Sequence, residues 1–132
     1  MKFKLYREYG SLNSKPIFDA FEKGLISLGH STTSKSSGIP VIWSVLWHGR
    51  MAKNQNVFNQ AIADGNPIII LEVGNLRRGD SWRISLNNIN NEGIFGNDDM
   101  LDLDRPSKLG ISLKPINKNR KDHILIACQH QR

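Results

Sequence analysis

The stretch of residues 66–79 constrains the fold of this chain more than any other. It opens on the turn residues Asn66 and Pro67, continues through the unbroken apolar run Ile68-Ile69-Ile70-Leu71, and then breaks into a glycine-containing loop. A β-branched run bounded by turn residues is typical of a strand that is buried on both faces. Such strands lie inside parallel sheets, whose ligands bind at the carboxyl ends of the strands. We therefore expect function in the loop that follows Leu71.

Two helical segments alternate with the predicted strands. Residues 17–28 carry apolar side chains at three- and four-residue spacing, with Ser14 as the expected N-cap and Gly29 as the stop. In chain order the predicted elements are strands at 3–6, 31–33, 39–45 and 68–71, helices at 15–28 and 54–64, a strand or hairpin arm at 80–87, and a last strand at 123–128. Strand–helix alternation is typical of α/β proteins. We therefore expect an α/β fold, a Rossmann-like three-layer domain with a mainly parallel central sheet.

Length and composition narrow the class of protein. The 132 residues fit one domain with a substantial core, and a single cysteine excludes an internal disulfide and a multi-cysteine zinc site. The sequence shows neither a membrane-spanning apolar run nor a signal-peptide pattern, so we expect a cytoplasmic protein. The four histidines are scattered without metal-ligand spacing, and no metal or cofactor is predicted. The net charge of +6 favours an anionic partner, which could be nucleic acid, a nucleotide or phosphate ligand, or a lipid head group.

The predicted strand at 123–128 is followed by residues 129–132 alone, whereas a central strand of an open α/β sheet normally leads into a loop and a covering helix. Either this strand is the last of the sheet, or the chain is one domain of a longer protein, and we favour the second interpretation. We therefore expect residues 1–132 to form a single Rossmann-like domain, the amino-terminal half of a longer protein whose carboxyl-terminal domain is missing from this chain.

Polar residues follow four of the predicted strands. They occupy residues 7–14, 47–50, 72–78 and 129–132. The carboxyl ends of parallel strands lie along one edge of a sheet, so these four junctions are expected to converge on a shared crevice. The alternative is that they are polar simply because loops lie at the surface.

The junction after the central strand carries the most specific signal. Gly74 and Gly79 allow the backbone to approach a ligand closely, and the paired Arg77 and Arg78 can bind phosphate or carboxylate in bidentate fashion. Glu72 directly follows the buried apolar run, where a charged side chain needs a partner. Its carboxylate could accept a hydrogen bond from a sugar hydroxyl or act as a base. Gly74, Asn75, Arg77 and Arg78 are therefore predicted to bind ligand, and the alternative is a glycine-rich turn with solvated arginines.

The loop before the first helix and two aromatic–cation pairs give further candidates. A glycine loop at a helix N-terminus can present N–H groups and hydroxyls to phosphate or carboxylate, although N-capping by Ser14 explains the same residues. Tryptophan rings can stack on sugars or bases but are also common in cores, and a loop histidine could act as a general base. These candidates are Gly10, Ser11, Asn13 and Ser14; Trp47, His48 and Arg50; Trp82 and Arg83; and Gln129 and His130.

The same junctions carry a family resemblance. The segments concerned are 3–13, 39–50, 70–79, 82–87 and 124–131. Together they resemble the amino-terminal half of phage and marine-bacterial glycosyltransferases related to capsule polysaccharide biosynthesis proteins. The resemblance implies a GT-B architecture, in which two Rossmann-like domains flank a cleft and the amino-terminal domain mainly faces the acceptor. It places Glu72, His48 and the Arg77-Arg78 pair at that cleft, and it implies that this chain is inactive alone.

Three functions are compatible with these observations. The leading hypothesis is the acceptor-side domain of a glycosyltransferase that uses a nucleotide-sugar donor and a polysaccharide or glycan acceptor, with Glu72 or His48 as the base. The second is a basic nucleic-acid-binding module that stacks bases on Trp47 or Trp82. The third is a nucleotide-binding Rossmann-like domain of another enzyme, although the full glycine fingerprint is lacking.

Overall fold

The computed structural model describes residues 1–74, 79–90, 92–96, 104–112 and 115. The chain divides into two compact units, Met1–Asp98 and Asp99–Arg132. Within the second unit the described residues include one short helix, α3 (Arg105–Lys108). The predicted strand at 123–128 lies outside the described residues. So do the candidates Asn75, Arg77, Arg78, Gln129 and His130.

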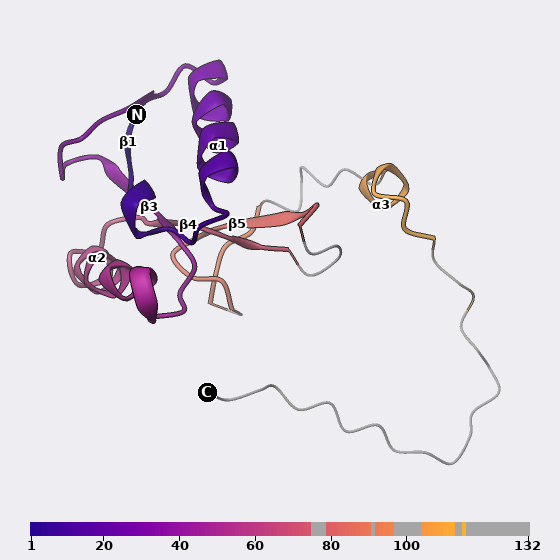
Figure 1. Ribbon diagram of the computed structural model, residues 1–132. Coiled ribbons are helices and arrows are strands. Elements are labelled where there is room, and N and C mark those ends of the chain that lie inside the picture. Colours follow the sequence, from indigo (N-terminus) through magenta and orange to yellow (C-terminus); the bar gives the residue numbers. More distant parts are fainter. Residues whose placement is uncertain (75–78, 91, 97–103, 113–114, 116–132) are drawn as a thin grey trace, which may run out of the picture. The chain divides into compact units, whose positions relative to one another are not determined.

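The first unit is built around a five-stranded sheet with the order β2-β1-β3-β4-β5 (Figure 1). The strands are β1 (Lys2–Leu5), β2 (Ser31–Thr32), β3 (Ile39–Trp43), β4 (Ile69–Val73) and β5 (Trp82–Leu86). The first four run parallel, and β5 pairs antiparallel with β4. The predicted α/β class with a mainly parallel sheet is therefore confirmed, and the alternating segment at 80–87 is a strand.

Helix α1 (Lys15–Ser27) covers one face of this sheet. Phe18 is fully buried between the helix and the strands, with its ring 6.5 Å from that of Trp43. The buried residues of this core layer are Phe3, Phe18, Leu25, Val41, Trp43 and Leu71. Strand residues two positions apart share a face, which is why alternate residues of β3 join the same layer.

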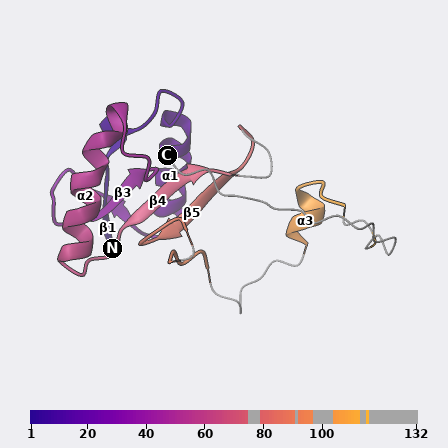
Figure 2. The same ribbon diagram turned by 90° about the horizontal axis from the view of Figure 1, so that it is seen from below.

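Helix α2 (Ala52–Ala63) lies on the opposite face (Figure 2). The buried residues of this second layer are Ile42, Ala61, Ile68 and Ile70. Ile70 and Leu71 belong to different layers and both are fully buried, as expected for a central strand that is covered on both sides. No helix among the described residues is long and apolar enough to cross a membrane.

Strand β5 has an unusual distribution of side chains. Ser85 is 2% exposed, whereas Trp82 and Ile84 on the other face are 38% and 53% exposed. The register places Ser85 opposite Ile70 and Ile84 opposite Leu71. The polar face of β5 therefore points towards the α2 side of the sheet, and its apolar face lies at the surface.

Three local predictions need correction. Ser14 is the residue before α1, but it adopts a helical conformation and makes no side-chain cap hydrogen bond. The second helix begins at Ala52 instead of Asn54, because a 3-10 turn, η2 (Gly49–Met51), leads directly into it. The strand predicted to end at residue 44 or 45 ends at Trp43, since Ser44 has a positive φ of 63°.

Candidate ligand site at the carboxyl edge of the sheet

Strand direction brings three of the four polar junctions to one edge of the sheet. β1, β3 and β4 are parallel neighbours, so the segments that follow Leu5, Trp43 and Val73 leave from the same edge. The short 3-10 helix η1 (Arg7–Tyr9) contacts both η2 and β3 there. Because β5 is antiparallel, its amino end lies at this edge too, with Trp82 opposite Val73. The fourth junction, residues 129–132, lies outside the described residues.

Asn54 holds the β1 and β3 ends of this edge together. Its side chain is fully buried, and its Nδ2 donates to the carbonyl oxygens of Trp43 at 2.9 Å and Tyr9 at 3.2 Å. The Oδ1 atom is buried and has no hydrogen-bond partner among the described residues. Sequence reasoning missed this residue, although a polar side chain in the first turn of a helix that follows a loop is the available signal.

Ser44 lies directly beyond β3 in a strained conformation. It is 1% exposed and has a φ of 63°, in the region that non-glycine residues rarely adopt. Its hydroxyl oxygen accepts a hydrogen bond from the N–H of Leu46 at 3.1 Å, which stabilises the turn. Backbone strain of this kind is often found at ligand sites. Ser44 was not predicted, because its backbone conformation has no signature in the sequence.

The predicted anion loop before α1 is closed by its own side chains. Ser14 is 2% exposed and its hydroxyl donates to the carbonyl oxygen of Ser11 at 2.8 Å. A Cβ on Gly10 would lie 3.1 Å from the Cβ of Ser14 and overlap its hydroxyl, so glycine is needed for close packing. Asn13 is exposed and Ser11 is half-buried. The Ser14 hydroxyl and the Gly10 position are thus engaged inside the loop instead of facing a ligand.

Arg7 follows the end of β1 and forms ion pairs with acids of α1. Its Nη1 lies 2.6 Å from Asp19 Oδ1 and its Nη2 lies 2.7 Å from Glu22 Oε2. Lys15 also binds Asp19, at 2.7 Å. Hydrogen bonds from Lys15 and then from Arg7 lower the pKa of Asp19 below its ordinary value of 3.8. These ion pairs of Arg7 therefore hold the loop after β1 against α1.

The predicted Trp47 platform is packed against the protein. The ring of Trp47 lies 5.4 Å from that of Phe58 on α2 and is half-buried in the second core layer. His48, directly before η2, and Arg50, within it, are exposed. In the described part of the chain, no hydrogen bond joins His48 to Glu72. The structure therefore leaves His48 and Arg50 accessible at the edge but not Trp47.

Glu72 and Arg83 lie side by side, directly opposite each other in the β4–β5 ladder. Both are half-buried, and both point to the α2 side of the sheet with Ile70 and Ser85. Among the described residues no ion pair joins them, and Glu72 Oε1 accepts only the N–H of Val73, at 2.7 Å. Arg83 Nε and Ser85 Oγ are buried, also without partners in that part of the chain. This acid–cation–hydroxyl group, which we call the Glu72–Arg83 site, is chemically incomplete.

Two neighbouring candidates have other places in the structure. A Cβ on Gly74 would lie 2.7 Å from the carbonyl carbon of Ser81, so this glycine lets β4 and β5 approach each other. Trp82 lies on the opposite face of β5 from Arg83, because successive strand residues alternate. The predicted aromatic–cation pair of Trp82 and Arg83 is therefore not formed.

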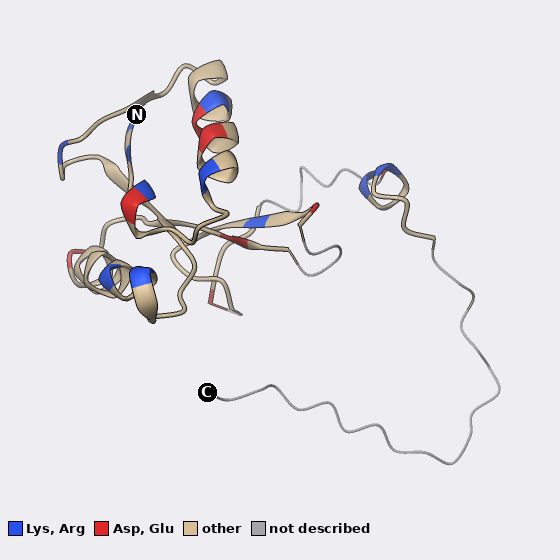
Figure 3. Cartoon of the chain, viewed as in Figure 1, with Lys and Arg blue, Asp and Glu red and all other residues tan. Residues whose placement is uncertain are grey.

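A row of cations and aromatic rings was not predicted. Lys4 Nζ lies 4.7 Å from the centre of the Tyr6 ring, which stacks on Tyr9 at 5.7 Å, and Lys53 Nζ lies 5.6 Å from the Tyr9 ring. The alternation of Lys4 and Tyr6 in the predicted strand 3–6 was the available sequence signal, although β1 ends at Leu5 and Tyr6 directly follows it. Elsewhere in the first unit, basic and acidic residues are interspersed, as on α1 (Figure 3).

Metal-binding groups and known relatives give no further information about the ligand of this edge. In the ranges that the structure describes, no group of three or more His, Cys, Asp or Glu residues could hold a metal ion. No family model, curated protein or solved structure matches this chain.

Proposed function

We propose that this chain is a Rossmann-like acceptor-side domain of a glycosyltransferase. It acts with a carboxyl-terminal partner domain on a nucleotide-sugar donor and a polysaccharide or glycan acceptor, and it is inactive alone. One observation carries the proposal: the Glu72–Arg83 site, near the edge where ligands bind in parallel sheets, holds a buried Arg83 Nε and a buried Ser85 hydroxyl without partners among the described residues. Beside them, the Glu72 carboxylate accepts only the N–H of Val73. Such groups cost free energy unless a ligand or solvent satisfies them.

The chemistry follows from these side chains. In inverting transfer, the Glu72 carboxylate takes the proton of an acceptor hydroxyl as that oxygen attacks the anomeric carbon of the donor. The bond from this carbon to the nucleoside diphosphate breaks, and the diphosphate leaves with the electron pair. The Arg83 guanidinium stabilises the negative charge of the diphosphate or of an anionic acceptor. His48 is the second candidate for the base.

A ligand titration tests the Glu72–Arg83 site. Uridine diphosphate added to the ¹⁵N-labelled chain is expected to shift the amide signals of residues 72–74 and 82–85 saturably. Arg83→Gln should weaken this binding at least about fivefold, whereas Lys23→Gln, which removes an exposed cation of α1, should leave it unchanged. Saturable shifts that are absent from this edge, or equal losses in both variants, would contradict the proposal.

The partner domain is tested at the level of the gene. A reading frame that continues past Arg132 into a second strand–helix domain supports the transferase, and the joined protein should then transfer sugar from a nucleotide-sugar donor. Glu72→Gln in that protein should lower kcat at least about a hundredfold. A stop codon after Arg132 counts heavily against the transferase.

The row of Lys4, Tyr6, Tyr9 and Lys53 favours a second candidate function, the binding of single-stranded nucleic acid. Cations that alternate with aromatic rings are typical of such surfaces. The affinity for a fluorescent oligonucleotide should then fall steeply as the salt concentration rises. Tyr9→Ala should weaken this binding more than the control Lys23→Gln, which changes a residue outside the row. Binding that is indifferent to salt would exclude this candidate.

A further inference from the structure

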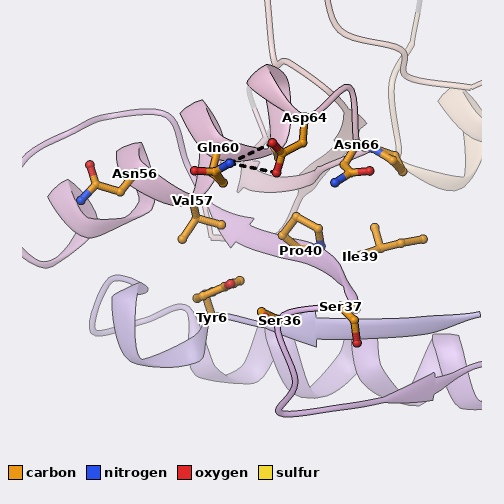
Figure 4. Close-up of a pocket in the computed structure, with 13 residues that line it drawn as sticks. Tyr6, Ser36, Ser37, Ile39, Pro40, Asn56, Val57, Gln60, Asp64 and Asn66 are labelled. Atoms are coloured by element: carbon orange, nitrogen blue, oxygen red, sulfur yellow. Dashed lines mark hydrogen bonds between the residues drawn. The ribbon is translucent and has the colours of Figure 1, made fainter.

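A concave region lies on the α2 face of the sheet, and its lining includes no residue of the Glu72–Arg83 site. It is a groove of about 530 Å³ between α2 and the segment that joins β2 to β3 (Figure 4). This volume falls in the range of about 300 to 1,000 Å³ that is usual for small-molecule sites. No sequence pattern pointed to it, because its walls come from segments far apart along the chain.

One wall of the groove is a row of polar side chains on α2. Asn56, Gln60 and Asp64 follow each other at four-residue spacing along one side of the helix, a length of about 12 Å. Gln60 Nε2 donates to both carboxylate oxygens of Asp64 at 2.9 Å, which fixes the two side chains relative to each other. The Gln60 amide oxygen remains an acceptor for a ligand hydroxyl.

The opposite wall and the floor have different chemistry. Ser36 and Ser37 supply hydroxyls across the groove, while Pro40 and Val57 supply an apolar floor (Figure 4). Tyr6 closes the end next to η1. Among the described residues, the side chains of Asn56, Ser36 and Ser37 have no hydrogen-bond partner, so they are available to a ligand.

The charge of the groove is opposite in sign to that of the chain. No Lys or Arg is among the described residues that line it, and Asp64 is its charged group. The whole chain, by contrast, has a net charge of +6. A phosphate, a nucleotide or a uronic acid would meet the Asp64 carboxylate, and no described lining residue supplies a cation; Lys4 Nζ lies over the Tyr6 ring at one end of the groove. The groove therefore selects against anions, which the Glu72–Arg83 site would attract.

The groove offers no strand edge to an extended peptide. The β3 strand beneath it, which contributes Pro40, is paired on both sides by β1 and β4, so β-augmentation is excluded there. Amide, carboxylate and hydroxyl groups above an apolar floor and a tyrosine suit a ring that has polar hydroxyls on its rim and C–H groups on its faces.

We propose that this groove binds a segment of an uncharged oligosaccharide. Asn56 and Gln60 exchange hydrogen bonds with its hydroxyls, Asp64 accepts hydrogen bonds from them, and Pro40 and Val57 contact its apolar faces. The groove starts at Tyr6, directly after β1, and continues to Asn66 before β4, so one end of a bound chain lies near the carboxyl edge. Only the identification of this glycan as the acceptor rests on the proposed function; the binding itself does not.

NMR titration with chitohexaose, maltohexaose and cellohexaose tests the groove. We expect at least one of these to shift the amide signals of residues 36–40 and 56–66 saturably. Gln60→Ala and Asn56→Ala should each weaken this binding at least about fivefold, as expected when a buried hydrogen bond to a ligand is lost. The matched controls Gln55→Ala and Asn59→Ala, on exposed positions of the same helix outside the groove, should leave it unchanged.

The outcomes separate this proposal from the transferase. The absence of saturable shifts in the groove with all three hexasaccharides overturns the glycan proposal, and so does tighter binding of a sulfated heparin hexasaccharide. Arg83→Gln should weaken diphosphate binding at least about fivefold without affecting glycan binding in the groove. Glycan binding that persists when the diphosphate test fails therefore leaves the groove established and the transferase unsupported.

Discussion

Asn54 and Asn56 lie two residues apart on α2 and have opposite roles. Asn54 faces the carboxyl edge, is fully buried, and donates to two backbone carbonyls. Asn56 faces the groove, is exposed, and has no hydrogen-bond partner among the described residues. The edge between β1 and β3 thus uses its polar groups to hold loops together, whereas the groove presents its polar groups to solvent. A polar side chain at a strand end is therefore weak evidence for ligand binding when the protein itself satisfies its hydrogen bonds.

The two asparagines should differ most in their effect on stability. Asn54→Ala removes the Asn54 donor from the carbonyls of buried Trp43 and half-buried Tyr9, which should lower the free energy of unfolding by about 2 to 4 kcal/mol. Asn56→Ala should change it by less than about 0.5 kcal/mol. Urea denaturation of both variants gives the comparison, and equal stabilities would show that the edge is not held by Asn54.

Two glycines provide the next contrast, between a crowded and an open position. Gly10→Ala forces a methyl group into the Ser14 side chain and should destabilise the protein by about 1 to 3 kcal/mol. Gly24→Ala, at an exposed position of α1 with nothing within 4 Å, should stabilise it by about 0.5 to 1 kcal/mol. Thermal unfolding measures both. Stabilisation by Gly10→Ala would mean that the loop before α1 has room for a ligand.

Salt should distinguish the two ligand sites. Raising the ionic strength from about 0.1 M to about 1 M shortens the Debye length from about 10 Å to about 3 Å. Diphosphate binding at the Glu72–Arg83 site should weaken severalfold over this range, because it depends on charge. Hexasaccharide binding in the groove should stay constant. Calorimetric titrations at both salt concentrations measure this, and parallel weakening would contradict the assignment of a neutral ligand to the groove.

The smallest effect concerns Asp19, which forms an ion pair with Arg7 next to the carboxyl edge of the sheet. Its pKa is lowered in the folded state, so the native protein binds fewer protons there than the unfolded chain. The resulting stabilisation is complete above the ordinary value of 3.8 and is lost as the pH falls through the lower folded value. Lys15→Ala should raise the pKa of Asp19, and Lys23→Ala should not. An NMR titration of the Asp19 carboxyl carbon measures this pKa in both variants, and an unchanged pKa in Lys15→Ala would contradict the prediction.

The framework of the fold could be predicted because its signals are local. The continuous apolar run of residues 68–71 indicated a strand buried on both faces, and Phe18 and Leu25 marked the buried side of α1. Boundaries were less accurate. The positive φ of Ser44 and the η2 turn depend on tertiary packing, which overrides local propensity at the ends of elements.

The site could be predicted only in part. Parallel strand order was enough to bring Glu72 and the loops after β1 and β3 to one edge. It could not reveal that Trp47 packs on Phe58, or that Trp82 and Arg83 point to opposite faces, since both depend on which side of the sheet each residue occupies. The groove was inaccessible to sequence reasoning, because Ser37 and Gln60 meet only in the folded chain.

The unequal edges of the sheet have a consequence for self-association. β2 is a two-residue strand and offers little template for pairing, whereas β5 has five residues and, in the described part of the chain, only a bridge from Leu86 to Ile94 on its outer side. A strand with exposed Trp82 and Ile84 at such an edge favours sheet extension between molecules. Arg83 opposes it, because pairing would desolvate an inward-pointing charge. An apolar residue at this position should therefore promote aggregation at high protein concentration.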